Sequence, residues 1–319
     1  MDRRAFVTGA VGLALAPGAL ARAGANVAVA LVTADLESRL VAVDLETGRV
    51  SRHVRTLASP RSIETVGNTA VVAHSELGAL SLVHGRTLGV AHVLRGFGEP
   101  RYTAAHRDGR HAYVTDAARG ELIVLDVPGA RVLARIRVGA RARHLGLDPS
   151  GRRLWVALGS KARELALVDV SQRARPRLVG LLRPPFLAHD VGWAPGGAHV
   201  WVSSGDRNEL AVYDAARARL LTRFAGDAPP QHVTFNGDRA YVTSGESGTL
   251  RVHRVDGRAL RTTRIPTGSY NVQQAHGWVV TPGLERGSLC VLDSSGRLVR
   301  RLQVAKSSHD ACVVIAERA

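Results

Sequence analysis

The chain has 319 residues, a formal net charge of +16 at pH 7, and hydrophobic residues make up 45% of it. This composition is that of a globular protein and excludes a disordered chain, and two cysteines are too few for a disulfide scaffold. No run of 18 or more apolar residues follows the amino-terminal segment, which argues against an integral membrane protein.

Residues 1–23 have the pattern of an export signal. Arg3 and Arg4 precede a short apolar stretch, and Ala21-Arg22-Ala23 fits an A-x-A cleavage site. Two arginines followed by Phe6 and an aliphatic residue are typical of a twin-arginine signal. We therefore expect a twin-arginine-type signal peptide over 1–23, with a plain secretory signal or an uncleaved anchor as alternatives. The mature protein would be periplasmic or extracellular, with no membrane span after cleavage.

A repeat of about 40 residues runs through the rest of the chain. Strand-like apolar segments such as Gly120–Val127 (GELIVLDV) and Gly287–Asp293 (GSLCVLD) end in a polar residue. Seven such positions follow one another at steps of 39 to 45 residues: Asp44, His84, Asp126, Asp169, Asp214, Arg254 and Asp293. This is the period of four-stranded propeller blades.

A second run of aromatic and β-branched residues precedes each polar position in five of the repeats, as at Ala112–Thr115 and Leu154–Ala157. Such runs indicate strands, and turns such as Asp148–Gly151 (DPSG) separate them. We expect the aromatic residues of these strands to pack between blades. Cys290 and Cys312 fall on strands of different blades, and we interpret them as small core residues.

The two chain ends complement each other. The amino-terminal part supplies three strands, over 27–34, 40–44 and 50–57, and the carboxyl-terminal part supplies one, over 309–315. Together they make a full blade, which leaves no strand edge unpaired in the ring. We therefore predict an all-β fold: one seven-bladed β-propeller over 24–319, with four-stranded antiparallel blades, closed by the carboxyl-terminal strand.

Three segments also carry a family resemblance. Ala112–Asp116 (AYVTD), Ala240–Ser244 (AYVTS) and the turn at Asp148–Gly151 resemble the YVTN-type seven-bladed β-propeller family, over about residues 26–316. The resemblance implies the propeller fold and an exported protein. It implies little about function, because the family includes proteins of many roles.

The start of each innermost strand is expected to face the mouth of the central channel. Aligning the repeats gives two adjacent polar positions in each blade. The first holds Arg61, Arg101, Arg143, His189, Gln231, Tyr270 and His309, and the second holds Ser62, Tyr102, His144, Asp190, His232, Asn271 and Asp310. A purely structural position would tend to repeat one small residue, so this varied ring is the candidate site.

Three consecutive blades offer an arginine to the mouth. A guanidinium makes bidentate contacts to carboxylates and phosphates, which predicts a small anionic ligand. The expected ligand-binding residues are Arg61, Arg101, Arg143, Tyr102, Gln231, Tyr270 and Asn271. The alternative is chance, because all but Lys161 and Lys306 of the 43 basic residues are arginines.

Other blades offer imidazoles and carboxylates. These groups suit zinc, copper, iron or nickel, and an incomplete shell would leave a position open. The expected metal ligands are His144, His189, Asp190, His232, His309 and Asp310. The alternative is a solvated channel lining, and the sequence has no local metal motif such as H-E-x-x-H.

Two hypotheses of function follow. The first is an exported, soluble, monomeric binding module that holds a small anionic ligand, a metal or a periplasmic partner protein at the mouth. The second is an oxidoreductase or cofactor-assembly protein, because the pattern is also similar to the d1-haem domains of nitrite reductases. That resemblance implies a tetrapyrrole whose iron is bound by His189 or His309.

Two further classes are disfavoured. The acidic metal-ligand sets of propeller lactonases and lyases are not recognisable in the sequence. Nucleic acid is an unfavoured partner despite the charge, because an exported location and an arginine-for-lysine bias both explain the charge otherwise.

Overall fold

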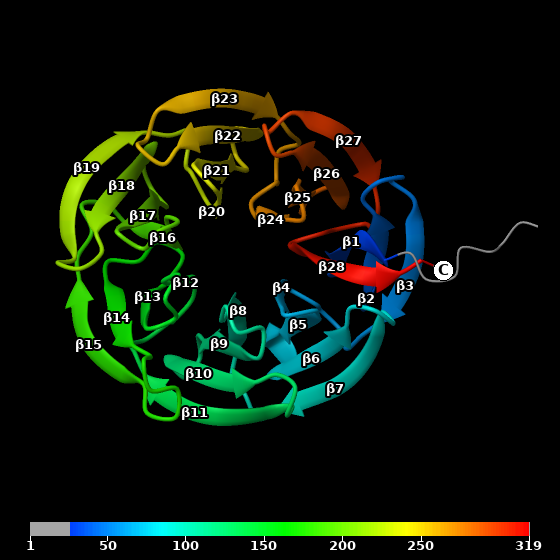
Figure 1. Ribbon diagram of the computed structural model, residues 1–319, viewed down its shortest axis with the longest axis horizontal. Helices are drawn as coiled ribbons and strands as arrows, with labels where there is room; N and C mark the ends of the chain where they lie inside the picture. Colours follow the sequence, from blue (N-terminus) through cyan, green and yellow to red (C-terminus); the bar gives the residue numbers. More distant parts are fainter. Residues whose placement is uncertain (1–25, 319) are drawn as a thin grey trace, which may run out of the picture.

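The computed structural model describes residues 26–318, and they form a ring of seven four-stranded antiparallel sheets around a central axis (Figure 1). The predicted seven-bladed propeller is confirmed. We number the blades in ring order. Blade 1 consists of β28 (Ala311–Glu317), β1 (Asn26–Ala34), β2 (Arg39–Asp44) and β3 (Val50–Arg55).

The other six blades each use four consecutive strands. Blade 2 has β4 (Ser62–Val66), β5 (Thr69–His74), β6 (Ala79–His84) and β7 (Gly89–Arg95), with a short 3-10 helix, η1 (Ser75–Leu77). Blade 3 has β8 (Pro100–Ala105), β9 (His111–Asp116), β10 (Glu121–Asp126) and β11 (Arg131–Arg137). Blade 4 has β12 (Leu145–Leu147), β13 (Arg153–Ala157), β14 (Leu165–Asp169) and β15 (Arg177–Leu182).

Blade 5 has β16 (Ala188–Trp193), β17 (His199–Ser204), β18 (Glu209–Asp214) and β19 (Arg219–Ala225). Blade 6 has β20 (Val233–Asn236), β21 (Arg239–Ser244), β22 (Thr249–Arg254) and β23 (Ala259–Arg264). Blade 7 has β24 (Gln273–Ala275), β25 (Trp278–Gly283), β26 (Ser288–Asp293) and β27 (Leu298–Gln303). Within residues 26–318, no helix is long and apolar enough to cross a membrane.

The middle strands of each blade are buried on both faces. Strand β10 reads ELIVLD and is buried from Leu122 to Asp126, whereas the outer strand β11 is mostly exposed. A strand covered on both faces carries a continuous apolar run, which is why the repeats lack strict alternation. The aromatic side chains of the second strands, Tyr113, Trp155, Trp201 and Tyr241, are at most 2% exposed and pack in the cores, as expected.

The repeated aspartate caps the turn after the third strand. Asp44 Oδ1 accepts the backbone N–H of Glu46 and of Thr47, each at 2.9 Å. In blade 7, Asp293 Oδ1 likewise accepts the backbone N–H of Ser295 and of Arg297. This side-chain hydrogen bonding to a following turn is a known preference of aspartate, and it gives the repeat its period.

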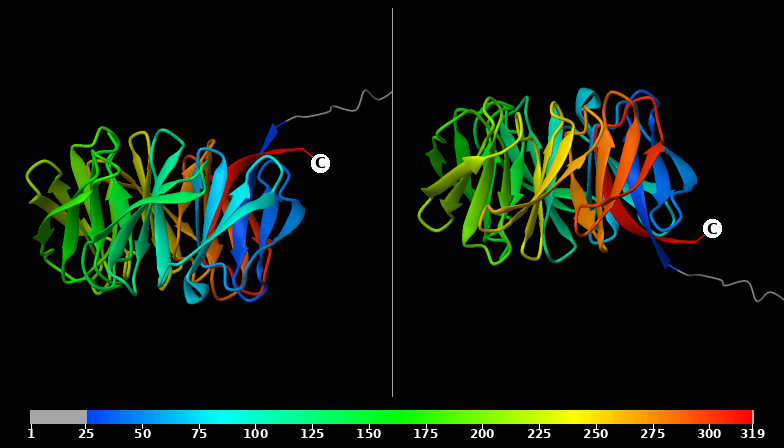
Figure 2. Two further views of the ribbon diagram at one scale, coloured as in Figure 1. Left: turned by 90° about the horizontal axis from the view of Figure 1, so that it is seen from below. Right: turned by 90° about the horizontal axis from the view of Figure 1, so that it is seen from above.

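The chain ends close the ring. β28 pairs antiparallel with β1, from Asn26 opposite Glu317 to Val32 opposite Ala311, and both ends of the described chain emerge at the same edge (Figure 2). The side chain of Asn68 in blade 2 adds two hydrogen bonds, to the N–H and the C=O of Ile315, each 2.8 Å. The predicted closure is therefore confirmed. The predicted signal at 1–23 lies outside the described residues.

Hydroxyl groups join neighbouring blades near the axis. Thr115 Oγ1 donates to the carbonyl of Arg143 at 2.6 Å, and Ser203 Oγ donates to that of Gln231 at 2.5 Å. Each bond runs from the second strand of one blade to the start of the next blade. These contacts hold in place the start of the next blade, where the polar residues of the channel mouth lie.

Candidate metal centre at the channel mouth

A cavity of about 290 Å³ opens at one end of the channel. It is lined mainly by the predicted ring: Arg61, Tyr102, Arg143, His189, Gln231, His232, Tyr270 and His309. A second cavity, of about 570 Å³, is lined by residues further along the same strands, and Tyr102 and His232 line both. These two side chains therefore lie between the two cavities.

Three imidazoles from consecutive blades meet at this point. Each of His144, His189 and His232 offers a ring nitrogen, and the three nitrogens lie within 4.8 Å of one another. His144 and His232 directly precede β12 and β20, and His189 is in β16. Three nitrogens on a tetrahedral zinc ion are about 3.4 Å apart, so small ring rotations would complete the set.

His144 has no hydrogen-bond partner. It is 1% exposed, and neither Nδ1 nor Nε2 bonds to any group of the described chain. His74 is equally buried, yet its Nδ1 bonds to the Ala58 carbonyl and its Nε2 to Ser81 Oγ, each at 2.9 Å. Because an unpaired buried polar group is costly, the bare ring of His144 is the feature that points to a ligand.

The other two rings are held by the protein. His189 Nδ1 lies 2.8 Å from the Ser160 carbonyl, and His232 Nδ1 lies 3.3 Å from Asp190 Oδ2. A carbonyl accepts only, so His189 carries its proton on Nδ1, and the Asp190 carboxylate favours the same tautomer of His232. This leaves Nε2 of both rings free, the arrangement common behind metal-bound histidines.

Two of the imidazoles, His144 and His189, favour the neutral form. Burial lowers the pKa of His189 to about 3, and the nearby charge of His232 adds to this effect. Burial, followed by the charges of His189, His232 and Arg143, holds the pKa of His144 well below its usual range. The neutral ring is the form that binds metals.

Asp190 has a second role. Its Oδ2 also accepts the N–H of Val233 at 3.1 Å, so it joins blade 5 to blade 6 while facing His232. Of the predicted metal residues, Asp190 therefore lies behind His232 and is not one of the three groups that meet.

The remaining predicted metal residues join blades instead of meeting the three imidazoles. His309 lines the cavity, but its Nδ1 lies 2.9 Å from the Arg61 carbonyl. Asp310 is buried, and its carboxylate accepts the N–H of Ile63 at 3.1 Å and of Ala311 at 2.9 Å. Asn271 Nδ2 donates to the His309 carbonyl at 2.6 Å, which likewise ties blade 7 to blade 1.

The three predicted arginines gather around Tyr102. Arg61 pairs with Asp35 at 3.4 Å, and Arg101 pairs with Glu99 at 3.0 Å. Burial lowers the pKa of Arg101, and the charge of Arg143 lowers it further, so these guanidiniums are close enough to repel. Arg143 lies 5.7 Å from the centre of the Tyr102 ring.

Tyr102 also contacts the imidazoles. Its ring centre lies 4.1 Å from that of His144 and 5.6 Å from that of His232. Of the other predicted ligand-binding residues, Gln231 accepts the N–H of Gly245 at 2.7 Å through Oε1, and Tyr270 lies against Gly245. Both line the cavity.

Some residues of the site were not predicted. The carbonyl of Ser160 orients His189, Lys161 lines the cavity, and Asp35 and Glu99 pair with two of the arginines. Ser160 and Lys161 lie in the loop between the second and third strands of blade 4, and such loops are expected to reach the mouth. The same repeat alignment could therefore have found them.

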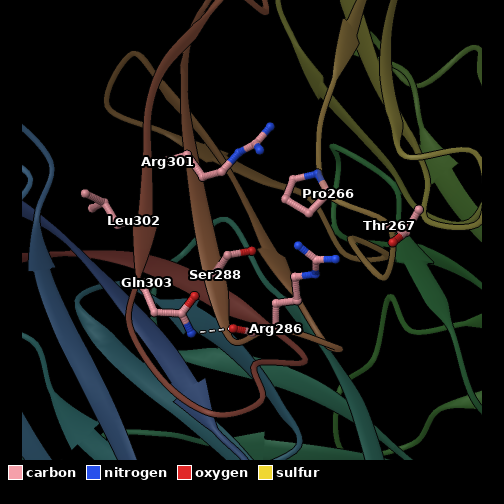
Figure 3. A pocket seen from close by; sticks show the side chains of 7 residues that line it. All are labelled: Pro266, Thr267, Arg286, Ser288, Arg301, Leu302 and Gln303. Carbon is pink, nitrogen blue, oxygen red and sulfur yellow. Dashed lines mark hydrogen bonds between the residues drawn. The ribbon is translucent and has the colours of Figure 1, made fainter.

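Another hollow, of about 440 Å³, lies near the outer strands of blades 6 and 7 (Figure 3). Arg286 and Arg301 line it, and the Gln303 amide donates to the Arg286 carbonyl. Its lining holds no imidazole, carboxylate or thiol. Within residues 26–318, the group of three or more potential metal ligands that lie close enough to share an ion is the one formed by His144, His189 and His232.

Comparisons with known proteins support the fold. No protein-family model matches the chain, and no curated protein is similar to it in sequence. Among solved structures, a functionally unknown protein from Desulfotomaculum acetoxidans is similar, with a TM-score of 0.76, 12% identity, and coverage of 90% of this chain and 98% of that one. Hydrazine synthase from Kuenenia stuttgartiensis is similar with a TM-score of 0.66, 14% identity, and coverage of 82% and 96%.

Proposed function

We propose that this protein is an exported β-propeller binding module that holds a transition metal ion at the mouth of its channel. His144, His189 and His232 are the ligands, and Asp190 positions His232. The observation that carries the proposal is the meeting of three imidazoles within 4.8 Å, one of them buried with no hydrogen-bond partner among residues 26–318.

The donor set limits the metal. Imidazole nitrogen suits zinc, copper, nickel and iron better than calcium or magnesium, which prefer oxygen. Three protein ligands leave a fourth position open, as in catalytic zinc sites rather than structural ones. His189 and His232 line the cavity of about 290 Å³, so an ion bound to them would be accessible to a small molecule.

Export supplies the context of the proposal. The pattern of residues 1–23 supports transport by the twin-arginine route to the periplasm or the cell exterior. A fusion of 1–23 to a reporter tests this: the reporter should be exported in a wild-type host and retained in one without the twin-arginine machinery. Export in both would leave the binding proposal intact and remove this route.

Metal titration tests the binding proposal. Metal-free protein is titrated with Zn²⁺ by calorimetry and compared with the variants His144→Ala, His189→Ala and His232→Ala. We expect one ion per chain for the wild type and a loss of affinity of at least 100-fold for each variant. His53→Ala is the control, because His53 is exposed on the outer strand β3. The proposal would be contradicted if the three site variants bound Zn²⁺ as tightly as the wild type and His53→Ala.

A second candidate is a tetrapyrrole-dependent oxidoreductase or cofactor-assembly protein. His309, Arg61 and Arg143 line the same mouth, which supports it, since arginines bind the carboxylates of such groups. The cavity volume of about 290 Å³, at the lower end for small-molecule sites, favours an ion with a small ligand. Absorption in the Soret region of protein purified from its native host decides between the two.

A further inference from the structure

We infer that the channel mouth binds a small oxyanion, of the carboxylate or phosphate type, between the metal ion and the guanidinium of Arg143. The inference rests on the proposed metal site and names the ligand that shares it. One oxygen of the anion would occupy the open metal position, and the others would accept hydrogen bonds from Arg143.

Arg143 is the arginine of the mouth that lacks an acidic partner. Arg61 and Arg101 face Asp35 and Glu99, whereas no carboxylate within 26–318 lies within 4.0 Å of Arg143. Its Nε is also buried without a hydrogen-bond partner. A guanidinium that is partly removed from water is stabilised by an anion, and an oxyanion matches its two-pronged geometry.

The charge around the cavity favours an anion. Arg61, Arg143 and Lys161 line it, and Lys161 makes no ion pair with the described chain. Glu246 is the one carboxylate of the lining. An excess of positive charge in a concave site concentrates anions there, and bound Zn²⁺ would increase that excess.

Tyr102 connects the imidazole cluster to Arg143. The Tyr102 ring lies 4.1 Å from the His144 ring and 5.7 Å from the Arg143 guanidinium carbon, so one side chain touches both halves of the site. The ring face also restrains the guanidinium through a cation–π contact. Gln231 and Tyr270 line the same cavity, and its volume of about 290 Å³ admits a small metabolite.

Cobalt spectroscopy tests this inference. Protein loaded with Co²⁺ in place of zinc is titrated with acetate and with phosphate, and with chloride as the reference anion, while the visible absorption of the ion is recorded. We expect acetate or phosphate to change the spectrum and to bind at least tenfold more tightly than chloride. A preference for acetate identifies a carboxylate ligand, and a preference for phosphate identifies a phosphate-type ligand; both support the inference.

Variants separate the anion site from the metal site. Arg143→Gln should weaken acetate or phosphate binding by 10- to 100-fold, the effect of losing a charge-assisted hydrogen-bond pair, and change Co²⁺ affinity less than threefold. Arg55→Gln, on the exposed face of β3, is the matched control and should change neither.

The outcomes distinguish the two proposals. If Co²⁺ binds but neither anion exceeds chloride, or if Arg143→Gln binds the anion like the wild type, the inference is overturned and the metal site stands. If Co²⁺ does not bind, the metal site itself is wrong, and the bridged anion is rejected with it.

Discussion

The bare ring of His144 leads to a prediction about stability. In the metal-free protein, one donor and one acceptor of this ring are buried without partners, at about 1–3 kcal/mol for each unsatisfied group. The substitution His144→Leu removes both and keeps an apolar side chain of similar size. It also removes the contact with Tyr102, a loss of about 1 kcal/mol. We therefore expect the variant to be more stable than the wild type by about 1–5 kcal/mol.

The assay is urea unfolding in the presence of EDTA, with His74→Leu as the matched control. His74 is as buried as His144, but both of its nitrogens are bonded, so its loss should lower the free energy of unfolding by about 2–4 kcal/mol. A residue that lowers the stability of the protein and is nevertheless present is typical of a functional site.

Adding metal stabilises the wild type relative to His144→Leu. With free Zn²⁺ at 100 times its dissociation constant, the wild type should gain about 2.7 kcal/mol and His144→Leu nothing. If His144→Leu is destabilised in EDTA as strongly as His74→Leu, the His144 ring has a structural role and the reasoning is refuted.

Three further predictions concern other parts of the molecule. Burial raises the pKa of Glu64 from 4.5 to about 7, so the wild type should lose stability as the pH rises from about 4.5 to 7, by at most about 3 kcal/mol, whereas Glu64→Gln should not. Asn68→Ala should lower the free energy of unfolding by about 1–3 kcal/mol, because it leaves the N–H and C=O of Ile315 without these bonds. Cys290 and Cys312 are buried with raised thiol pKa values, so neither should react with a thiol reagent until urea unfolds the protein.

Each of these has a contradicting result. Parallel pH profiles for wild type and Glu64→Gln would show that the carboxyl of Glu64 is not perturbed by burial. An unchanged urea midpoint for Asn68→Ala would show that the Asn68 side chain does not stabilise the closure of the ring. Rapid labelling of one thiol in the folded protein would place that cysteine outside the core.

The fold could be predicted from the sequence because its period has a local cause. The repeated aspartate bonds to its own turn, so the signal depends on nearby residues alone. In blade 6, where Arg254 replaces the aspartate, Asp256 accepts the N–H of Arg258 instead. The single strand at the carboxyl terminus matched the three at the amino terminus, and that made the closure predictable.

The site was only partly predictable. The repeat alignment placed His144, His189 and His232 at one mouth. It could not show which of the two adjacent polar residues in each blade points to the channel axis. The structure explains this, because the register of β16 shifts between Ala188 and Val191, at the position of His189 and Asp190. Such a bulge changes which side chain points to the axis, and no local pattern marks it.

The hydrogen bonds between blades were not predictable either. His309 and Asp310 look like ligands in the alignment, yet the Arg61 carbonyl and the Ile63 N–H lie beside them. These partners are backbone groups more than 240 residues away in the sequence. The same chemistry that binds a metal also satisfies buried backbone, and only the packing of blades decides which role a side chain takes.

X-ray absorption at the zinc edge tests the metal site most directly. For protein loaded with one Zn²⁺ per chain, we predict three imidazole nitrogens at about 2.0–2.1 Å and one oxygen ligand, from water or an anion, at the open position. His232→Ala should lower the imidazole count by one. A spectrum dominated by oxygen ligands, or an imidazole count that His232→Ala leaves unchanged, would contradict the account.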